Sequence, residues 1–282
     1  MKRWIIGNST SRRENISEEL FSEFSKSGFG AMDITLRYPK KEENISADER
    51  FSWYKNLDTS KIRKWSSNYG VDVWAFHLPF GHTYYNIASL CKDEREYTVE
   101  KQSEILAIAS ETGAKIAVIH PSGEPITDID RETSMDFASE SLVKLADVAK
   151  RNGLILAVEN LPRTCLGRDS KEIKKLIDAD SSLGVCFDVN HLLQESHCEF
   201  VNNIGDKIVT LHISDYDFND EKHWIPGFGK IDWQELIELI KNIGYSGPFM
   251  NEIACNMNGE TIGNYTFAEV YAANESILKK YF

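Results

Sequence analysis

The amino-acid sequence predicts an α/β fold, in which eight parallel strands close into a single (β/α)₈ barrel domain spanning residues 1–282. Eight short apolar runs bounded by Gly, Pro or Asn indicate buried strands. Amphipathic stretches with helical periodicity separate these runs, and most of them end at a glycine, as helices often do. The runs are apolar throughout, which is typical of parallel strands that are covered on both faces and joined by right-handed strand–helix–strand units.

Each element follows from its own stretch of sequence. The predicted strands cover residues 4–7, 31–36, 71–78, 115–120, 154–160, 183–189, 207–213 and 248–253. Helical patterns cover residues 17–29, 99–113, 139–153 and 232–244, and a last helix over residues 267–281 completes the outer ring. The longest insertions, residues 40–56 and 82–97, are predicted to be loops after the second and third strands. A doubly wound open sheet is the structural alternative, but no GxGxxG motif follows the first strand.

Composition limits the function classes. The chain is 41% hydrophobic and 27% charged, and its 32 basic and 44 acidic residues give a net charge of −12. An acidic balance disfavours binding to nucleic acids and anionic membranes, and no apolar run reaches the roughly 18 residues of a membrane span. The five cysteines form no CxxC pair, so neither a disulfide framework nor a cysteine zinc site is indicated. We therefore expect a cytoplasmic enzyme with no nucleic-acid or membrane partner, and the sequence leaves a homo-oligomer open.

Polar residues end six of the predicted strands. They are His77, His120, Glu159, Asp188, His212 and Glu252, and the loops that follow add His191 and His223. Active sites of such barrels lie at the carboxyl ends of the strands, and charged groups at the end of a buried strand are costly unless paired or bound to a metal. The pattern therefore predicts one polar site at the mouth of the barrel.

The types of residue in this set indicate a binding site for a divalent metal ion. Glu159, Asp188, Glu252 and His212 make an oxygen-rich donor set, which suits one ion of Mn²⁺, Mg²⁺ or Co²⁺. The remaining imidazoles could hold a second or third ion, and Zn²⁺ would then be favoured. Arg163, in the loop after the fifth strand, is a candidate to bind a substrate hydroxyl or carboxylate. Aromatic residues near the loops are candidates for the floor of a sugar site; they are Trp53, Trp74, Phe80, Tyr84, Tyr85 and Trp224.

Seven motifs fall in order on the predicted strands. They are FHLPFG (76–81), VIHPSGEP (118–125), AVEN (157–160), FDVNH (187–191), LHISDYD (211–217), HWIPGFGKIDW (223–233) and NEI (251–253). Over nearly the whole chain this set resembles the xylose isomerase-like TIM barrel superfamily, which includes sugar isomerases and epimerases, inosose dehydratases and apurinic/apyrimidinic endonuclease IV. Each motif is weak alone, whereas their order is specific for the superfamily.

The resemblance to the sugar epimerases implies roles for individual residues. It implies that Glu159, Asp188, His212 and Glu252 bind one catalytic ion, and that Glu159 and Glu252 exchange protons with the substrate from opposite faces. It also implies that His191 hydrogen-bonds a substrate oxygen. Two departures weaken a ketose 3-epimerase assignment: Cys165 stands where those enzymes have a second glutamate, and Phe218 stands where they have an arginine.

The resemblance to endonuclease IV implies a different chemistry. Its three-metal ligand positions are matched by His77, His120, Glu159, Asp188, His191, His212, His223 and Glu252, and Glu221 replaces an aspartate. This set makes a multinuclear zinc phosphodiesterase an alternative. The net charge of −12 disfavours that reading.

We predict from these observations a divalent-metal-dependent isomerase or epimerase of carbohydrate metabolism. It would act on a small polyhydroxylated carbonyl substrate by proton abstraction through a metal-stabilised enediolate. Loss of a β-substituent from the same enediolate would make the protein a lyase or dehydratase on the same scaffold, and the sequence does not separate these outcomes.

Overall fold

The computed structural model describes residues 4–11, 13–37, 46–81, 83–257 and 263–282. The strands of the main sheet are β1 (Ile6–Ser9), β2 (Ala31–Thr35), β3 (Asp72–His77), β4 (Ile116–Ile119), β5 (Ile155–Glu159), β6 (Gly184–Asp188), β7 (Ile208–His212) and β8 (Phe249–Asn251). All their pairings are parallel, in the order β7-β6-β5-β4-β3-β2-β1-β8. A parallel bridge between Ile213 and Asn251 joins β7 to β8. The predicted eight-stranded barrel is therefore confirmed.

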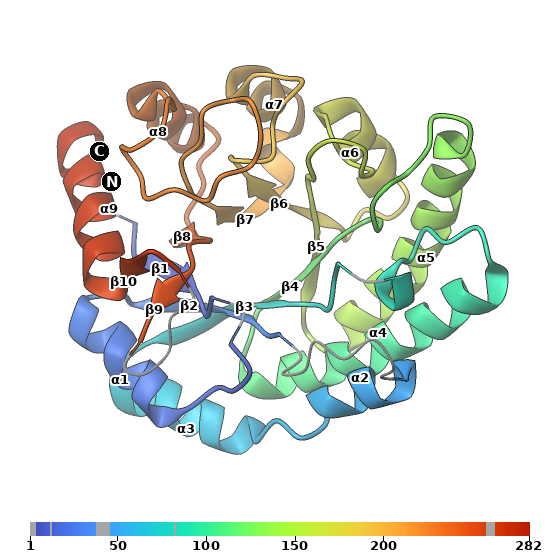
Figure 1. Cartoon of the computed structure of the whole chain (residues 1–282), viewed down its shortest axis with the longest axis horizontal. Coiled ribbons are helices and arrows are strands. Elements are labelled where there is room, and N and C mark those ends of the chain that lie inside the picture. The colour runs from blue at the N-terminus through green and yellow to red at the C-terminus, as the bar shows by residue number, and fades with distance from the viewer. Residues whose placement is uncertain (1–3, 12, 38–45, 82, 258–262) are drawn as a thin grey trace.

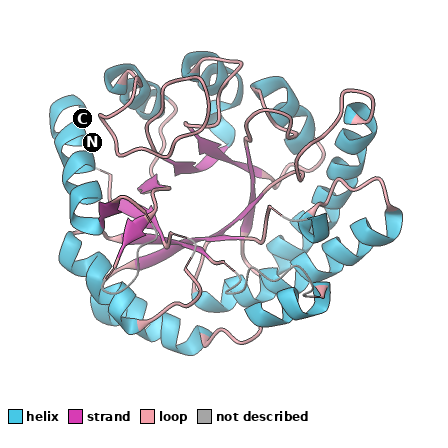
Figure 2. Ribbon diagram, in the orientation of Figure 1, coloured by secondary structure: helices cyan, strands magenta, loops and turns pink. Residues whose placement is uncertain are grey.

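Helices surround this sheet (Figures 1 and 2). They are α1 (Glu18–Ser27), α2 (Ala47–Tyr54), α3 (Thr59–Tyr69), α4 (Lys92–Thr112), α5 (Arg131–Arg151), α6 (Ser170–Ile177), α7 (His197–Ile204), α8 (Trp233–Asn242) and α9 (Phe267–Tyr281). Two 3₁₀ turns, η1 (Thr83–Tyr85) and η2 (Gly205–Lys207), and the short strands β9 (Cys255–Asn256) and β10 (Tyr265–Thr266) complete the described elements. The helices predicted at 17–29, 99–113, 139–153, 232–244 and 267–281 correspond to α1, α4, α5, α8 and α9. None of the helices in the described ranges has the length and apolarity that a segment crossing a bilayer needs.

The two predicted insertions are partly helical, so the prediction of plain loops was wrong there. In residues 40–56, of which 40–45 lie outside the described part, Ser46 caps α2 by accepting the Glu49 N–H. Phe51 and Tyr54 are buried and attach this helix to the core. In residues 82–97, of which residue 82 is not described, α4 already begins at Lys92. Acidic residues in the first turn of both helices favour a helix amino terminus.

Helix ends follow local chemistry that is visible in the sequence. Ser17 accepts the Leu20 N–H at the start of α1, and Gly28 ends that helix in the left-handed conformation with a φ of 99°. Thr266 and Glu269 form a reciprocal capping box at the start of α9. These caps fix where α1 begins and ends and where α9 begins.

Trp74 lies at the amino ends of the strands, where it lines a cavity of about 500 Å³ together with Trp4, Asp72 and Lys115. Trp74 is the extra residue of a β-bulge in β3, and its indole N–H lies 3.2 Å from Thr210 Oγ1 on β7. Small and branched side chains fill the layer above it; these are Ala75, Ile116, Val118, Ala157 and Cys186. Trp74 thus lies at the opposite end from the strand carboxyl termini and does not belong to the predicted aromatic floor. This layer of packed side chains lies inside the barrel, beneath the polar residues at the carboxyl ends of the strands.

Candidate metal centre

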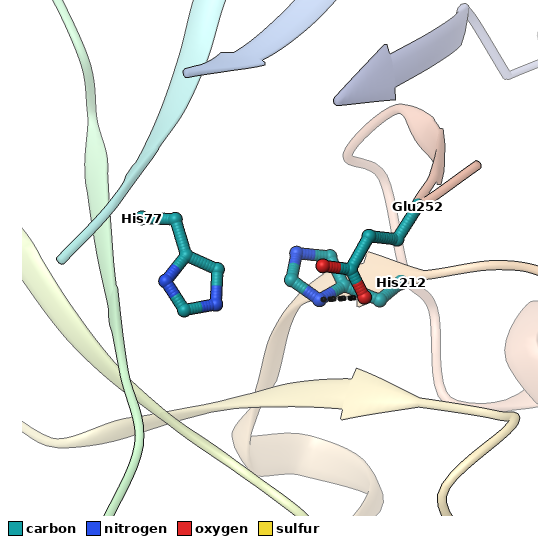
Figure 3. Close-up of side chains that lie close together, drawn as sticks. All are labelled: His77, His212 and Glu252. Carbon is teal, nitrogen blue, oxygen red and sulfur yellow. Dashed lines mark ion pairs between the residues drawn. The ribbon is translucent and has the colours of Figure 1, made fainter. Parts of the chain in front are cut away.

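The polar residues predicted at strand ends meet at the carboxyl end of the barrel. His77, Glu159, Asp188 and His212 are the last residues of β3, β5, β6 and β7, and His120 and Glu252 directly follow β4 and β8. All except the partly exposed His120 are buried. Figure 3 shows the imidazole of His212 beside the Glu252 carboxylate, with His77 facing them. The residues that the sequence analysis grouped are therefore brought together by the fold.

Glu159 is the centre of this cluster. Its Oε1 lies 2.9 Å from His212 Nδ1, while its Oε2 lies 3.0 Å from His77 Nε2 and 3.2 Å from His120 Nε2. Burial disfavours the charged carboxylate, but the imidazoles of His212 and His120 hold the pKa of Glu159 well below its usual range. Burial lowers the pKa of His120, which favours the neutral imidazole that a metal requires.

The three predicted carboxylate ligands of the first ion lie on the Nδ1 side of His212. His212 Nδ1 is 2.9 Å from Glu159 Oε1, 3.7 Å from Glu252 Oε2 and 3.9 Å from Asp188 Oδ2. Nδ1 of His212 thus faces one oxygen from each of the three carboxylates. Among the described residues, the imidazole that completes a group with all three carboxylates within 4.8 Å is that of His191 rather than that of His212.

The Asp188 carboxylate provides a test of whether a cation fits there. Its Oδ1 accepts the Asn190 N–H at 2.6 Å, whereas its buried Oδ2 accepts no hydrogen bond within the described part of the chain. Burial raises the pKa of Asp188 despite the nearby imidazole of His191, and the charges of Glu252 and Glu159 raise it further. A buried carboxylate oxygen without a donor is costly. A divalent cation between these oxygens would remove that cost, so the donor set fits the ion.

The further histidines adjoin this set. One donor atom each from Glu159, Asp188, His191 and Glu252 lie within 4.8 Å of one another. The same holds for four overlapping groups of described residues: His77, His120 and Glu159; His191, His223 and Glu252; His77, His212 and Glu252; and Glu159, Cys186 and His212. His191 is thus near enough to act as a ligand. Its predicted role as a substrate-orienting residue stays a prediction, as does a second or third ion.

His191 also connects the cluster to the rim through Glu221. Its Nδ1 lies 2.9 Å from the carbonyl oxygen of Asn160, and its Nε2 lies 3.2 Å from Glu221 Oε2. Burial alone would lower the pKa of His191, but the carboxylates of Asp188 and Glu221 raise it to about 10. The contact with His191 lowers the pKa of Glu221 to about 2 against the effect of burial.

Arg163 is surrounded by carboxylates of the protein itself. Its guanidinium lies 2.8 Å from Asp220 Oδ1, 3.2 Å from Glu124 Oε1 and 3.2 Å from Glu221 Oε1. These contacts join the loops after β4, β5 and β7, and Arg163 adopts a left-handed backbone with a φ of 53°. In this structure the carboxylates of Asp220, Glu124 and Glu221 accept hydrogen bonds from the guanidinium. The contact of Arg163 with substrate stays a prediction.

Two cavities reach the cluster from outside. A cavity of about 210 Å³ is lined by His120, Glu159 and His191, and its apolar wall includes Phe80 and Leu161. A second cavity of about 280 Å³ is lined by Ser9, Ser11, Arg37 and His223. Glu221 and Glu252 line both cavities. The ring centre of Phe80 lies 4.5 Å from that of His77 and 4.3 Å from that of His120, so this residue of the predicted aromatic floor does border the site.

Asp33 also belongs to the site, although it was not among the residues predicted from the sequence. This residue lies on β2, is fully buried, and places its Oδ2 3.0 Å from His212 Nε2. The available signal was one charged residue inside the apolar run AMDITL, where a strand covered on both faces should carry none.

The fold and the cluster together define a class: parallel eight-stranded α/β barrels with buried carboxylates and imidazoles at the carboxyl ends of the strands. Within that class, a family model described as xylose isomerase-like TIM barrel matches residues 21–266. The chain belongs to this family.

The curated proteins that are similar to this chain include an uncharacterised protein, an epimerase and a dehydratase. The chain is 30% identical over 194 residues to the uncharacterised protein MJ1311 of Methanocaldococcus jannaschii, covering 64% of this chain and 63% of that protein. It is 29% identical over 117 residues to fructoselysine 3-epimerase of Escherichia coli O157:H7, covering 39% and 42%. It is 21% identical over 262 residues to inosose dehydratase of Geobacillus thermodenitrificans, covering 83% and 81%. The match thus spans less than two thirds of MJ1311 and of the epimerase.

Solved structures share the fold over almost the whole chain. A D-tagatose 3-epimerase-like protein superposes with a TM-score of 0.76 at 23% identity, covering 98% of this chain and 96% of that one. The IolI protein with a bound zinc atom superposes with a TM-score of 0.74 at 17% identity, covering 99% of each chain. At these identities the superpositions establish the barrel alone.

Proposed function

We propose that the protein is a divalent-metal-dependent isomerase or epimerase of a small polyhydroxylated carbonyl compound. The observation that carries the proposal is the convergence of Glu159, Asp188 and Glu252 on Nδ1 of His212, with one Asp188 oxygen lacking a donor among the described residues. The names of two relatives, fructoselysine 3-epimerase and inosose dehydratase, support carbohydrate chemistry.

Glu159, Asp188, His212 and Glu252 would hold the ion, which we expect to be Mn²⁺, Mg²⁺, Co²⁺ or Zn²⁺. When bound, the ion supplies Lewis-acid polarisation of the substrate carbonyl. A zinc atom bound to the structurally similar IolI protein supports this expectation.

The acid–base chemistry falls to Glu252 and Glu159. A carboxylate beside the substrate carbonyl can remove the proton on the adjacent carbon. Glu252 lines both cavities and is 8% exposed, whereas Glu159 is fully buried with both oxygens in contact with imidazoles. We therefore assign proton removal to Glu252, which afterwards releases its proton to solvent. Proton return on the other face of the substrate is assigned to Glu159, which takes up the proton that it delivers from the cavity that it lines.

His191 would orient the substrate. Its ring is 5% exposed and lines the 210 Å³ cavity beside Glu159 and Glu252. The Asn160 carbonyl fixes the ring through Nδ1, and Nε2, which contacts Glu221 in this structure, would donate to a substrate oxygen in place of that contact.

Two measurements test the proposal. Elemental analysis of the purified protein should find a stoichiometric divalent ion. Incubation with D-fructose, D-tagatose or D-psicose in deuterated water should place deuterium on the carbon next to the carbonyl, and removal of the ion with a chelator should stop this exchange. A protein that carries no ion, or that in its loaded form exchanges no proton next to the carbonyl of these ketoses or of a panel of aldoses and inososes, would contradict the assignment.

The overlapping donor groups favour a second candidate, a multinuclear zinc phosphodiesterase. His77 and His120 meet at Glu159 Oε2, and His191 and His223 lie near Glu252, so the cluster offers donors for more than one ion. Metal-dependent nicking of abasic duplex DNA, with three ions per chain and binding that weakens steeply with salt, would favour this function. The inosose dehydratase relative supports a lyase reaction as a third outcome, which the products of the ketose incubation would reveal.

A further inference from the structure

Three imidazoles of the site each direct Nδ1 at a main-chain carbonyl oxygen. Nδ1 of His77 lies 2.9 Å from the Leu78 carbonyl oxygen, and Nδ1 of His223 lies 3.0 Å from the Glu252 carbonyl oxygen. Nδ1 of His191 lies 2.9 Å from the Asn160 carbonyl oxygen. Carbonyl oxygens only accept hydrogen bonds, so each of these nitrogens carries its proton. Main-chain carbonyl oxygens therefore orient these three rings. Because the acceptors belong to the main chain, a side-chain substitution would not remove them.

His212 is oriented differently. Its Nε2 lies 3.0 Å from Oδ2 of Asp33, and both side chains are fully buried. Asp33 lies on β2 and His212 on β7, so the contact links two strands that are not neighbours in the sheet. The second oxygen of Asp33, Oδ1, has no hydrogen-bond partner within the described residues. A buried carboxylate is costly without a partner, and the imidazole of His212 is the partner that the fold provides.

We infer that Asp33 is a positioning residue that makes His212 a ligand for the divalent ion. This inference rests on the metal site of the proposed function. The Asp33 carboxylate accepts the Nε2 proton of His212, which leaves the lone pair on Nδ1. That nitrogen faces the oxygens of Glu159, Glu252 and Asp188. A carboxylate behind a histidine fixes its tautomer and ring orientation, and strengthens it as a metal donor.

The geometry also explains why Asp33 is tolerated inside the sheet. Position 33 lies on a buried strand between Met32 and Ile34, which are both fully buried. An apolar residue there would pack without an unsatisfied oxygen, as Oδ1 of Asp33 now has. A stability role alone does not account for the carboxylate, whereas alignment of His212 does.

The test compares the affinity of the metal-free protein for Co²⁺ with that of Asp33→Asn, by competition against a chelating dye. The asparagine keeps the volume but removes the charge, so we expect binding about 10- to 100-fold weaker and a changed visible spectrum of bound Co²⁺. The matched control is Thr210→Val, at a fully buried position on the same strand as His212. Thr210 contacts Trp74, so this variant should lose stability and keep its Co²⁺ affinity.

A double-mutant cycle shows whether Asp33 acts through His212. In a His212→Gln background, Asp33→Asn should weaken Co²⁺ binding no further, because the group that it positions is gone. If Asp33→Asn does not fold, ¹⁵N NMR of the loaded wild-type protein still decides the matter: we expect a proton on Nε2 of His212. A proton on Nδ1, or equal Co²⁺ affinity of the wild type and Asp33→Asn, would overturn the inference. A wild-type protein that binds no divalent ion would instead overturn the proposed function itself.

Discussion

Glu159 and His212 lie in contact at the centre of the barrel mouth, with 2.9 Å between Oε1 of the carboxylate and Nδ1 of the imidazole. The same carboxylate turns its other oxygen towards His77 and His120. Glu159 therefore joins His212, a predicted ligand of the first ion, to two further imidazoles, and one of these, His77, also has a donor atom within 4.8 Å of donor atoms of His212 and Glu252. Substitutions of Glu252, Asp188 and His191 test the binding of the first ion and the acid–base chemistry beside it.

Glu252→Gln should abolish ketose proton exchange. The amide keeps the volume of the side chain but removes its basicity and one charged ligand. Because positioned acid–base groups typically contribute about 10²- to 10⁴-fold, we expect a rate loss of at least that size. Deuterium incorporation measured by mass spectrometry gives the rate. Glu238→Gln, at an exposed position of α8, is the matched control and should exchange at the wild-type rate. Full activity of Glu252→Gln would exclude this residue as the base.

His191→Asn and Asp188→Asn should differ in what they lose. His191 hydrogen-bonds the substrate in our proposal, so its replacement should lower turnover by about 10²-fold or more while the ion stays bound. Asp188→Asn removes a charged ligand, and the protein should lose the ion. Metal content after dialysis separates the two variants. Equal loss of metal would make His191 a ligand, as its place within 4.8 Å of the other donors allows, and would favour the multinuclear hydrolase.

The site residues at strand ends were predictable from the sequence because a polar side chain that terminates an apolar run must point into the barrel mouth. The charge of Asp33 inside an apolar run was visible, but its role was not, because its partner His212 lies 179 residues away and on a strand that is not its neighbour. Helix α2 was missed for a related reason. Its sequence is largely polar, and burial of Phe51 and Tyr54 against the rest of the chain attaches it to the core. Long-range partners, rather than local propensity, decide both features.

The ion pair between Arg131 and Glu172 should stabilise the fold in a pH-dependent way. Arg131 Nε and Nη2 each lie 2.7 Å from an oxygen of Glu172, and both side chains are mostly buried. Burial opposes ionisation of Glu172, but the guanidinium holds its pKa below the ordinary value of 4.5. A depressed carboxyl pKa adds stability above the unfolded-state value, which is lost as the pH falls through the folded-state value. Glu172→Gln should therefore lower the free energy of unfolding near neutral pH by about 1.5–3 kcal/mol.

Urea unfolding of the wild type and of Glu172→Gln at neutral and acidic pH measures the contribution of this ion pair to the free energy of unfolding. The difference between wild type and Glu172→Gln should shrink as the pH falls below 4.5. Glu132→Gln is the control, because Glu132 forms an exposed pair with Lys175 and should cost less than about 1 kcal/mol. A difference that stays constant down to acid pH would show that ionised Glu172 is not the source of the stability.

Arg163→Met should impair turnover with little effect on stability. Its side chain is 37% exposed, so its ion pairs with Glu124, Asp220 and Glu221 should together change the free energy of unfolding by about 1 kcal/mol or less. The kinetic effect should be larger, because Glu221 joins Arg163 to His191. Arg163→Lys should not restore activity, since one ammonium group cannot bind three carboxylates in the fixed geometry of a guanidinium.

The His191→Asn background distinguishes this route from direct substrate binding by Arg163. If Arg163 acts through Glu221 and His191, adding Arg163→Met to His191→Asn should lower kcat/KM little further. If the guanidinium itself binds substrate, the two losses should multiply. Arg151→Met is the control, because Arg151 forms an exposed pair with Asp147 on α5 and should leave both kcat and KM unchanged. Non-additive losses would thus assign Arg163 to the support of the site, and multiplicative losses would assign it to the substrate.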